Sequence, residues 1–379
     1  MATRGYAAPE TMRDFARARA LCAELPGSPD IYPVLRGLLS YHHVRAELGD
    51  AYELGEELLR HAHANAADTA LRVQANYGHG ATLFHQGAFT AAATHLEAAR
   101  REYDPAQHAT HARVYGGYDP GVACCMWGAW GLVLQGQVEE AVALDREGLA
   151  LARRLPDAFT LAWACYGAGV TRQMLGDYPA SEALSAEGAT LAEEHGFPHV
   201  LGIATINRGW AVMMQGRAPI GIPMLREGVA AVEATGAALM HSSYLGMLAA
   251  ADAMEGDRAA ALRCFDQGLA EAQISGERLN LAGLLIGKSH LLMRGGTGGR
   301  TSRATLEEAE DCLRRALEVA RRQGARLVEL RAAVALARHC DRQGRVAEGR
   351  AVLSAAHAWF ADRSAGAPEI ATARQLLAS

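Results

Sequence analysis

The chain has 379 residues, a formal net charge of −5, and 50% hydrophobic against 21% charged side chains. This charge argues against nucleic-acid binding, which needs a basic surface, and the sequence holds no apolar run long enough to span a membrane. The N-terminus lacks the apolar core of a secretory signal. Seven cysteines without Cys-x-x-Cys spacing are typical of reduced thiols. We therefore expect a cytoplasmic protein without nucleic-acid or membrane partners.

Glycine recurs at a fixed interval through the middle of the chain. One series is spaced by 40 residues, and a second series with the same spacing lies half a period away: Gly136, Gly176, Gly216 and Gly256, then Gly196, Gly236 and Gly276. Each glycine follows an amphipathic run of four to five turns, where it can take the left-handed conformation that ends a helix. The pattern predicts an all-α fold, an α-solenoid of about eight TPR-like (tetratricopeptide-like) helical hairpins in a right-handed superhelix.

In chain order, we expect one unpaired helix, then helical hairpins, then a short C-terminal element. The expected helices span residues 9–25, 31–47, 51–65, 69–85, 89–102, 122–134, 138–155, 158–175, 179–195, 198–215, 219–235, 238–255, 258–275, 279–293, 304 onward, 327–343 and 346–361. The turn of the first hairpin is expected at Gly49. We treat 1–379 as a single solenoid, because a solenoid grows by adding repeats.

Three segments interrupt the regular spacing. Residues 103–121 contain two Asp-Pro steps and three glycines, which favour turns, so we expect an inter-repeat loop there. Residues 295–303 are glycine-rich and are expected to form a flexible linker. Residues 367–379 are expected to cap the C-terminal end of the solenoid, whose apolar surface would otherwise be exposed.

Small residues recur where the two helices of a tetratricopeptide hairpin cross most closely. Seven residues before the turn glycine, six hairpins have glycine or alanine, namely Gly80, Ala129, Gly169, Gly209, Ala249 and Ala337. Five residues after the turn glycine, a second small residue occurs in five hairpins: Ala92, Ala141, Ser181, Gly221 and Ala261. The period of 40 residues exceeds the usual value of about 34, which indicates long helices.

Several segments also carry a resemblance to a known class of proteins. They are Gly5 to Glu10, Tyr103 to Pro105 with His108 and His111, Asp119 to Val122, Arg208 to Ala211, and Ala316 to Leu336. The chain resembles the C-terminal tetratricopeptide region of bacterial signalling proteins that combine a class III adenylate or guanylate cyclase with an ATPase module. It is more loosely similar to the tetratricopeptide arm of large ATP-dependent transcription activators. The resemblance implies a regulatory or assembly arm that binds a partner or effector.

Projecting the tetratricopeptide register onto the first helix of successive hairpins places large apolar residues along the concave groove. These residues are Tyr77, Phe84, Met126, Trp130, Trp163, Tyr166, Ile206, Trp210 and Met213. Such a stripe could grip a peptide or a helix, or it could simply fill the core between long helices. The register places Asn207 but no lysine in the groove, so the Lys/Asn clamp of chaperone-binding repeats is absent. A second cluster, expected at the groove edge, lies in the 103–121 loop: Asp104, His108, His111, Tyr115 and Asp119.

No sequence motif predicts catalysis, a metal or a cofactor. The chain lacks the GxxxxGK[ST] phosphate loop, the HExxH zinc motif and the GxSxG nucleophile motif. We therefore expect a noncatalytic scaffold that binds a protein or peptide partner. The alternative is a sensor in which a small-molecule effector binds inside the superhelix and regulates a linked cyclase or ATPase.

Overall fold

The protein is described by a computed structural model covering residues 7, 9–24, 28–108, 110, 114–115, 117–294, 302–361 and 367–378. All regular elements in these ranges are helices, which confirms the predicted fold class. In chain order they are α1 (Pro9–Ala23), α2 (Ile31–Val44), α3 (Leu48–Ala64), α4 (Thr69–His85), α5 (Phe89–Glu102), α6 (Pro105–His108), α8 (Pro120–Leu134), α9 (Val138–Arg154), α10 (Ala158–Met174), α11 (Tyr178–His195), α12 (Pro198–Met214), α13 (Ala218–Ala234), α14 (His241–Glu255), α15 (Arg258–Ser275), α16 (Leu281–Met293), α17 (Arg303–Gln323), α18 (Arg326–Arg342), α19 (Val346–His357), the short 3-10 helix η1 (Ala358–Phe360) and α20 (Pro368–Ala378).

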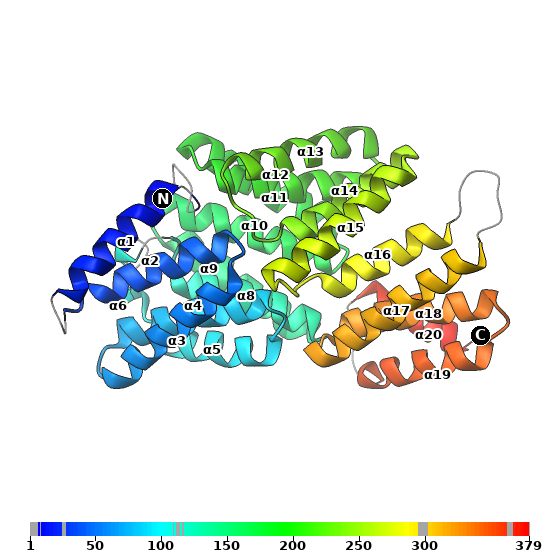
Figure 1. Ribbon diagram of the computed structural model, residues 1–379, viewed down its shortest axis with the longest axis horizontal. Helices are drawn as coiled ribbons and strands as arrows, with labels where there is room; N and C mark the ends of the chain where they lie inside the picture. Colours follow the sequence, from blue (N-terminus) through cyan, green and yellow to red (C-terminus); the bar gives the residue numbers. More distant parts are fainter. Residues whose placement is uncertain are drawn as a thin grey trace.

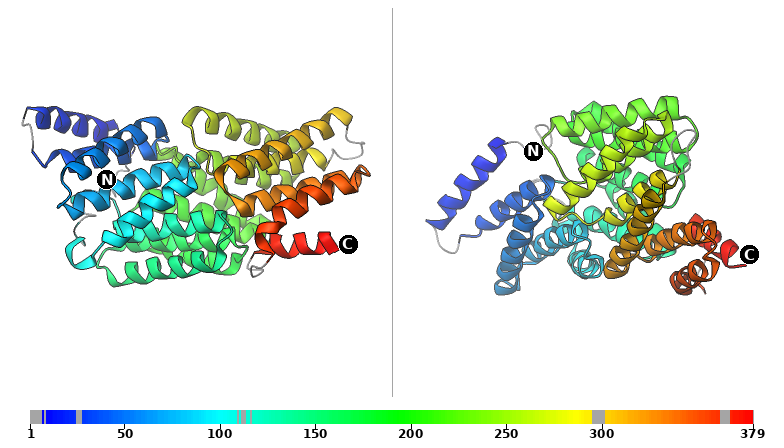
Figure 2. Two further views of the ribbon diagram at one scale, coloured as in Figure 1. Left: turned by 90° about the horizontal axis from the view of Figure 1, so that it is seen from below. Right: turned by 45° about the vertical axis from the view of Figure 1, so that its right-hand side comes forward.

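Consecutive helices pack as hairpins: α2 with α3, α4 with α5, α8 with α9, α10 with α11, α12 with α13, α14 with α15, α16 with α17, and α18 with α19. The stack of hairpins is curved. Its first helix, α1, and its last, α20, lie at opposite ends of the molecule (Figure 1). Figure 2 shows the same arrangement from two further directions. No helix in the described ranges is both long and apolar enough to span a membrane.

The glycines of both series end helices as predicted. All seven have positive φ angles, between 69° and 88°. After α8, for example, the Gly136 N–H donates to Val133 O (3.0 Å) and the Gln137 N–H donates to Leu132 O (2.8 Å). These paired bonds satisfy carbonyls that the helix end would otherwise leave free.

The turn of the first hairpin is not where the sequence suggested. Gly49 lies inside α3, and Ala46 takes the left-handed conformation instead, with φ of 58°. The Ala46 N–H donates to His43 O (3.0 Å), the same helix-ending bond that the glycines make. Packing explains this earlier turn. It lets α3 start at Leu48, whose side chain is buried in the core. Tertiary contacts thus outweigh the cost of placing an L residue in the left-handed region.

The crossing point of a hairpin requires glycine most clearly between α12 and α13. A Cβ atom added to Gly209 would lie 2.6 Å from Leu225 N, and one added to Gly221 would lie 2.5 Å from Gly209 O. Both contacts are too close for any side chain. The predicted small-residue positions therefore bring the two backbones into direct contact.

Successive turns of the superhelix touch each other through hydrogen bonds at helix ends. The Val44 carbonyl, at the end of α2, accepts from the N–H groups of residues 238–239 at 2.9 and 3.0 Å. One hairpin later, the His85 carbonyl accepts from the N–H groups of residues 278–279 at 2.8 and 3.1 Å. The chain therefore returns to its own N-terminal part after about five hairpins, and the first helix of each hairpin faces a shared lumen.

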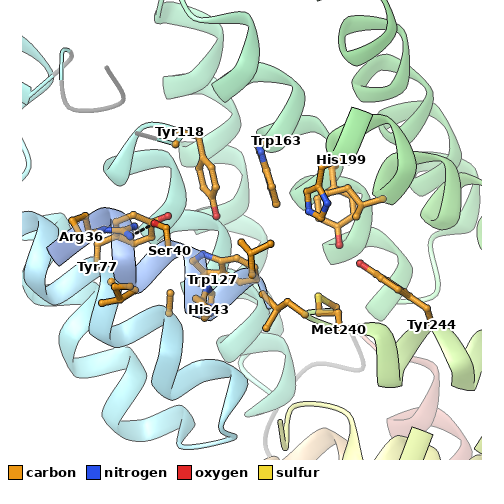
Figure 3. A pocket seen from close by; sticks show the side chains of 18 residues that line it. Arg36, Ser40, His43, Tyr77, Tyr118, Trp127, Trp163, His199, Met240 and Tyr244 are labelled. Atoms are coloured by element: carbon orange, nitrogen blue, oxygen red, sulfur yellow. Dashed lines mark hydrogen bonds between the residues drawn. The ribbon is translucent and has the colours of Figure 1, made fainter. Parts of the chain in front are cut away.

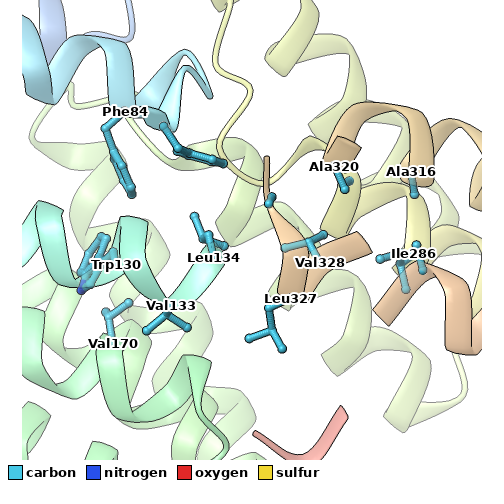
Figure 4. Close-up of a cluster of buried hydrophobic side chains, with 14 of the residues drawn as sticks. Phe84, Trp130, Val133, Leu134, Val170, Ile286, Ala316, Ala320, Leu327 and Val328 are labelled. Atoms are coloured by element: carbon cyan, nitrogen blue, oxygen red, sulfur yellow. The ribbon is translucent and has the colours of Figure 1, made fainter. Parts of the chain in front are cut away.

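A continuous apolar core joins the two turns. In Figure 4, Trp130 and Leu134 of α8 and Val170 of α10 face Val328 of α18 and Ile286 of α16. These side chains belong to one cluster of buried residues although more than 100 positions separate some of them along the chain. The superhelix is thus closed by hydrophobic burial as well as by the helix-end hydrogen bonds.

The three irregular segments have distinct structures. Residues 103–121 include the short helix α6, and α8 already begins at Pro120. Most of the 295–303 segment lies outside the described residues, and its Ser302 caps α17 by accepting from the Thr305 N–H (3.1 Å). At the C-terminus, α20 packs on α18 and α19. It is also tied to the α10 end, because Arg331 pairs with Glu369 (2.5 Å) and donates to Met174 O (2.9 Å).

Candidate functional site

The lumen contains a cavity of about 670 Å³, which we call the main cavity. Its lining comes mainly from the first helices of seven hairpins, α4, α8, α10, α12, α14, α16 and α18, together with the start of α20. Residues that line it include Phe84, Trp130, Tyr166, Gln173, Ile206, Asn207, Trp210, Ser243, Tyr244, Arg331 and Glu369. Pockets of this size in proteins hold small ligands and are mostly apolar with a few placed polar groups, and this lining has that character.

The predicted groove residues face the lumen but are largely enclosed. Phe84, Trp130, Ile206 and Trp210 line the main cavity, and Tyr166 lines both it and a smaller neighbouring chamber. Within the stripe, only Trp163 and Trp210 are half-buried. The other seven are buried: Tyr77, Phe84, Met126, Trp130, Tyr166, Ile206 and Met213.

Some of the predicted groove residues therefore border a cavity, and others only fill the core. Trp130 is 1% exposed, and its indole N–H donates to Gly167 O at 3.0 Å, so it is a structural residue on the cavity wall. Met126 and Met213 are buried and line neither of the two cavities. That the remaining members contact a ligand stays a prediction.

Several buried polar atoms on the main cavity wall have no hydrogen-bond partner among the described residues. They are Gln173 Oε1, Asn207 Oδ1, Ser243 Oγ and Glu369 Oε2. A buried polar atom without a partner costs about 1–3 kcal/mol, so folds seldom retain four around one cavity. These atoms offer hydrogen-bonding positions to a ligand in an otherwise apolar lining.

The smaller chamber, about 70 Å³ in volume, lies next to the main cavity (Figure 3). We call it the Arg36 chamber. Tyr166 and Tyr244, which also interact through their hydroxyl groups, line both spaces, so the chamber and the main cavity adjoin at these side chains. Opposite Arg36, the rings of Tyr118 and Trp163 stack with centroids 4.6 Å apart.

The loop residues predicted at the groove edge mainly stabilise their own segment. Asp119 is buried, caps α8 through the Val122 N–H (3.1 Å), and accepts from Tyr103 Oη (2.6 Å). Burial raises the pKa of this carboxyl above its usual range.

Asp104 caps α6 by accepting from the Ala106 N–H (2.9 Å), and its own N–H donates to His108 Nδ1 (2.9 Å). Tyr115 is half-buried, and burial raises the pKa of its hydroxyl. His111 lies outside the described residues.

One group of side chains has the spacing of a metal site, although the sequence predicted none. His42, Glu47 and Asp50 lie together near the first hairpin turn. His42 Nδ1 is 2.7 Å from Glu47 Oε2, and Arg45 Nε donates to the other oxygen of Glu47 at 2.8 Å. An arginine therefore already compensates the charge of Glu47, and the arrangement is accounted for without a metal ion.

The sequence analysis missed several residues that shape the two cavities. Arg36, Tyr118, His199 and Tyr244 line the Arg36 chamber. Arg36 could have been noticed, because it is the only Arg, Lys, Asp or Glu in α2, on an otherwise apolar face. The others carry no signal in the sequence, since they come from separate hairpins and meet only when the superhelix closes.

These hairpins and their shared lumen define the protein as a TPR-like α-solenoid. Comparisons with protein-family models and with curated proteins find no match. Among solved structures, a Rap protein complexed with competence and sporulation factor is similar to the chain, with a TM-score of 0.56 and 14% identity over 92% of this chain and 96% of that one. Aspartyl phosphate phosphatase F from Bacillus subtilis has a TM-score of 0.50 and 13% identity over 95% and 91%. At these identities the likeness shows the fold alone.

Proposed function

We propose that this chain is a noncatalytic cytoplasmic scaffold that binds a short, extended peptide in its lumen. The observation that carries the proposal is the main cavity, an aromatic and apolar space with four unpaired polar atoms on its wall. Alternating apolar surface and hydrogen-bonding positions suit a peptide, whose side chains and backbone need both. The Rap protein of similar fold was crystallised in complex with competence and sporulation factor, which supports a ligand-binding role for this fold.

The unpaired polar atoms on the wall favour an extended peptide over the helix that the sequence analysis also allowed. A helix satisfies its own backbone N–H and C=O groups, whereas an extended backbone needs partners such as Gln173 and Asn207.

A second candidate is a small-molecule effector sensor, which the same cavity volume favours. In both cases the ligand would contact helices from both turns of the superhelix. Binding would therefore bias the contacts at Val44 and His85 that hold the turns together, and this change of shape is the signal we propose. The resemblance to cyclase- and ATPase-linked regions supports a regulatory arm of a signalling protein, and the net charge of −5 supports the absence of a nucleic-acid ligand.

A thermal-shift experiment tests the proposal. The ligands are pools of N-acetyl pentapeptides randomised over Ala, Val, Leu, Ile and Phe, and a separate library of metabolites. A pool that contains a lumen ligand raises the melting temperature of the native protein, because binding stabilises the folded state. We expect Trp210→Ala, which removes a half-buried side chain from the main cavity wall, to abolish the rise. The matched control Trp359→Ala, which changes a 40% exposed side chain lining neither cavity, should retain it.

Each remaining outcome has a definite meaning. A response to metabolites without any response to peptides would replace the peptide proposal with the effector sensor. A response that persists in Trp210→Ala would place the ligand outside the main cavity. Turnover of a substrate by the purified chain would contradict a noncatalytic role.

A further inference from the structure

Arg36 is a buried cation at the narrow end of the lumen. It is 5% exposed and comes from the middle of α2, where its neighbours Leu35 and Leu38 are buried apolar side chains. Moving a charged group out of water costs several kcal/mol unless an opposite charge or strong hydrogen bonds compensate. The partners of Arg36 therefore decide whether the charge is satisfied within the fold.

All partners of the Arg36 guanidinium group are uncharged. Its Nε donates to Gln74 Oε1 at 3.2 Å, an Nη atom donates to Ser40 Oγ, and its centre lies 4.6 Å from the Tyr77 ring centroid. No carboxylate of the described residues lies within ion-pair distance of it. The arginine thus has oriented neutral partners but no counter-charge.

The other groups around the Arg36 chamber are also donors or neutral. No Asp or Glu lines it. The indole nitrogens of Trp127 and Trp163 are buried and have no partner among the described residues, and the same is true of His199 Nδ1. An indole nitrogen can only donate. The indole N–H groups of Trp127 and Trp163, from α8 and α10, are therefore unused donors among the residues that line the chamber.

The histidines that line the chamber, His43 and His199, add no second positive charge. Burial lowers the pKa of His199 to about 4, so its ring is neutral at pH 7. Burial, together with the charges of His85 and Arg36, lowers the pKa of His43 well below its usual value. The chamber consequently carries a single positive charge, on Arg36, at neutral pH.

We propose that the Arg36 chamber binds the carboxylate group of the lumen ligand, with the guanidinium group as counter-charge and the indole N–H groups as further donors. This inference rests on the proposed function, because the main cavity, which adjoins the chamber at Tyr166 and Tyr244, then holds the apolar remainder of the same ligand. Arginine matches a carboxylate with two parallel hydrogen bonds. The chamber volume of about 70 Å³ corresponds to roughly five water positions, enough for a carboxylate and its adjoining carbons.

The first experiment tests the chamber without any assumption about the full ligand. The 15N-labelled protein is titrated with sodium propionate, with propionamide as the neutral analogue and sodium chloride as the control for ionic strength. We expect propionate to shift the indole N–H signals of Trp127 and Trp163, while the exposed Trp359 gives an unmoved reference signal. In Arg36→Gln the shifts should disappear, and in the matched control Arg60→Gln, which changes an exposed arginine of α3, they should remain.

The second experiment links the chamber to the lumen ligand. The pentapeptide pools are prepared with a free C-terminal carboxylate and, separately, as C-terminal amides. We expect the free-acid pool to bind at least tenfold more tightly than the amide pool to the native protein, and with equal affinity to Arg36→Gln. If Arg36→Gln does not fold, Arg36→Lys replaces it, because lysine keeps the charge but loses the paired geometry and should reduce the preference severalfold.

The outcomes separate the two proposals. Equal binding of acid and amide pools, or propionate shifts that persist in Arg36→Gln, would overturn the carboxylate site while leaving a peptide-binding lumen intact. Propionate shifts that depend on Arg36, with no binding of either pool, would support the carboxylate site and reject the peptide ligand. No effect of propionate on any indole signal would overturn the site directly.

Discussion

Charged side chains are paired on the outer surface of this protein, whereas the Arg36 chamber contains a charge without a counter-charge. On the outside, Glu310 contacts Arg345 and Arg314, and Glu348 contacts the same two arginines. Burial alone would raise the pKa of Glu310, but hydrogen bonds from Arg345 and Arg314 outweigh this effect and lower it to about 2. In the lumen, Arg36 has no carboxylate partner among the described residues.

This difference in charge pairing identifies Arg36 as a group whose strongest possible interaction, an ion pair, is not formed within the fold. Surface pairs gain little free energy each, because water already solvates both charges. A buried charge without a partner lowers stability, so its retention in the lumen is more consistent with a ligand contact than with folding. The following experiments test this contrast, starting with the largest expected effect.

Two tryptophans of the predicted stripe should differ sharply. Trp130→Ala removes a fully buried side chain and the hydrogen bond to Gly167 O, and we expect a loss of about 3–5 kcal/mol. Trp163→Ala should cost clearly less, because the side chain is half-buried and its indole nitrogen is unpaired. Urea unfolding followed by far-UV circular dichroism measures both. Equal losses would remove the distinction between wall and ligand-facing residues.

Glu277 provides a pH-dependent test of the buried interior. Burial raises the pKa of this carboxyl from 4.5 to about 7, against hydrogen bonds from the Met240 N–H and Ser242 Oγ that lower it. Between pH 4.5 and 7 the folded state holds a proton that the unfolded state has lost, so stability falls as the pH rises through this window. At about 1.36 kcal/mol per pH unit, the total is about 3 kcal/mol.

The pH effect is measured by comparing variants. Glu277→Gln should gain about 3 kcal/mol relative to the native protein between pH 4.5 and pH 8, as measured by urea unfolding at both values. Glu193→Gln, which changes an exposed residue of α11, should show no such gain. A constant difference across this range would mean that Glu277 ionises normally in the folded protein.

Replacing the lumen arginine should stabilise the ligand-free protein. Arg36→Met removes the buried charge and keeps a long side chain, and we expect a gain of about 1–3 kcal/mol in urea unfolding. The gain should be insensitive to salt. A destabilised Arg36→Met would indicate that the contacts with Gln74, Ser40 and Tyr77 compensate the charge within the fold.

The smallest effect is expected on the outer surface. Arg314→Ala breaks two ion pairs, with Glu310 and Glu348, yet should cost only about 0.5–1 kcal/mol. Unfolding in added sodium chloride should reduce this cost further, because salt screens exposed charges. A loss as large as that of Trp130→Ala would show that the network, rather than the apolar core, holds the last hairpins.

Much of the fold could be predicted because its signals are local. The glycine spacing, the helix lengths and the close-packing positions depend on backbone conformation within one hairpin, and the structure confirms them at Gly136, Gly209 and Gly221. The first turn could not be predicted, since Ala46 has no intrinsic preference for a positive φ. Its conformation is imposed by the burial of Leu48 in the assembled stack.

The candidate site was predicted only in outline. The tetratricopeptide register identified the helix face that borders the lumen, because side chains three and four positions apart share one face of a helix. It did not predict how far the superhelix closes, and so it did not separate Trp130 on the cavity wall from Trp163 at the chamber. That distinction depends on contacts between hairpins that lie far apart in the sequence.

The sequence by itself determined a stack of long helical hairpins, since each helix and each glycine turn is specified by its near neighbours. Only the tertiary structure decided that α2 meets residues 238–239 and α4 meets residues 278–279, which turns an open groove into a lumen. The same closure surrounds Arg36 with neutral groups from several hairpins. Whether the charge of Arg36 is compensated depends on all groups within a few ångströms of it. These groups come from distant parts of the chain, so no local sequence pattern predicts them.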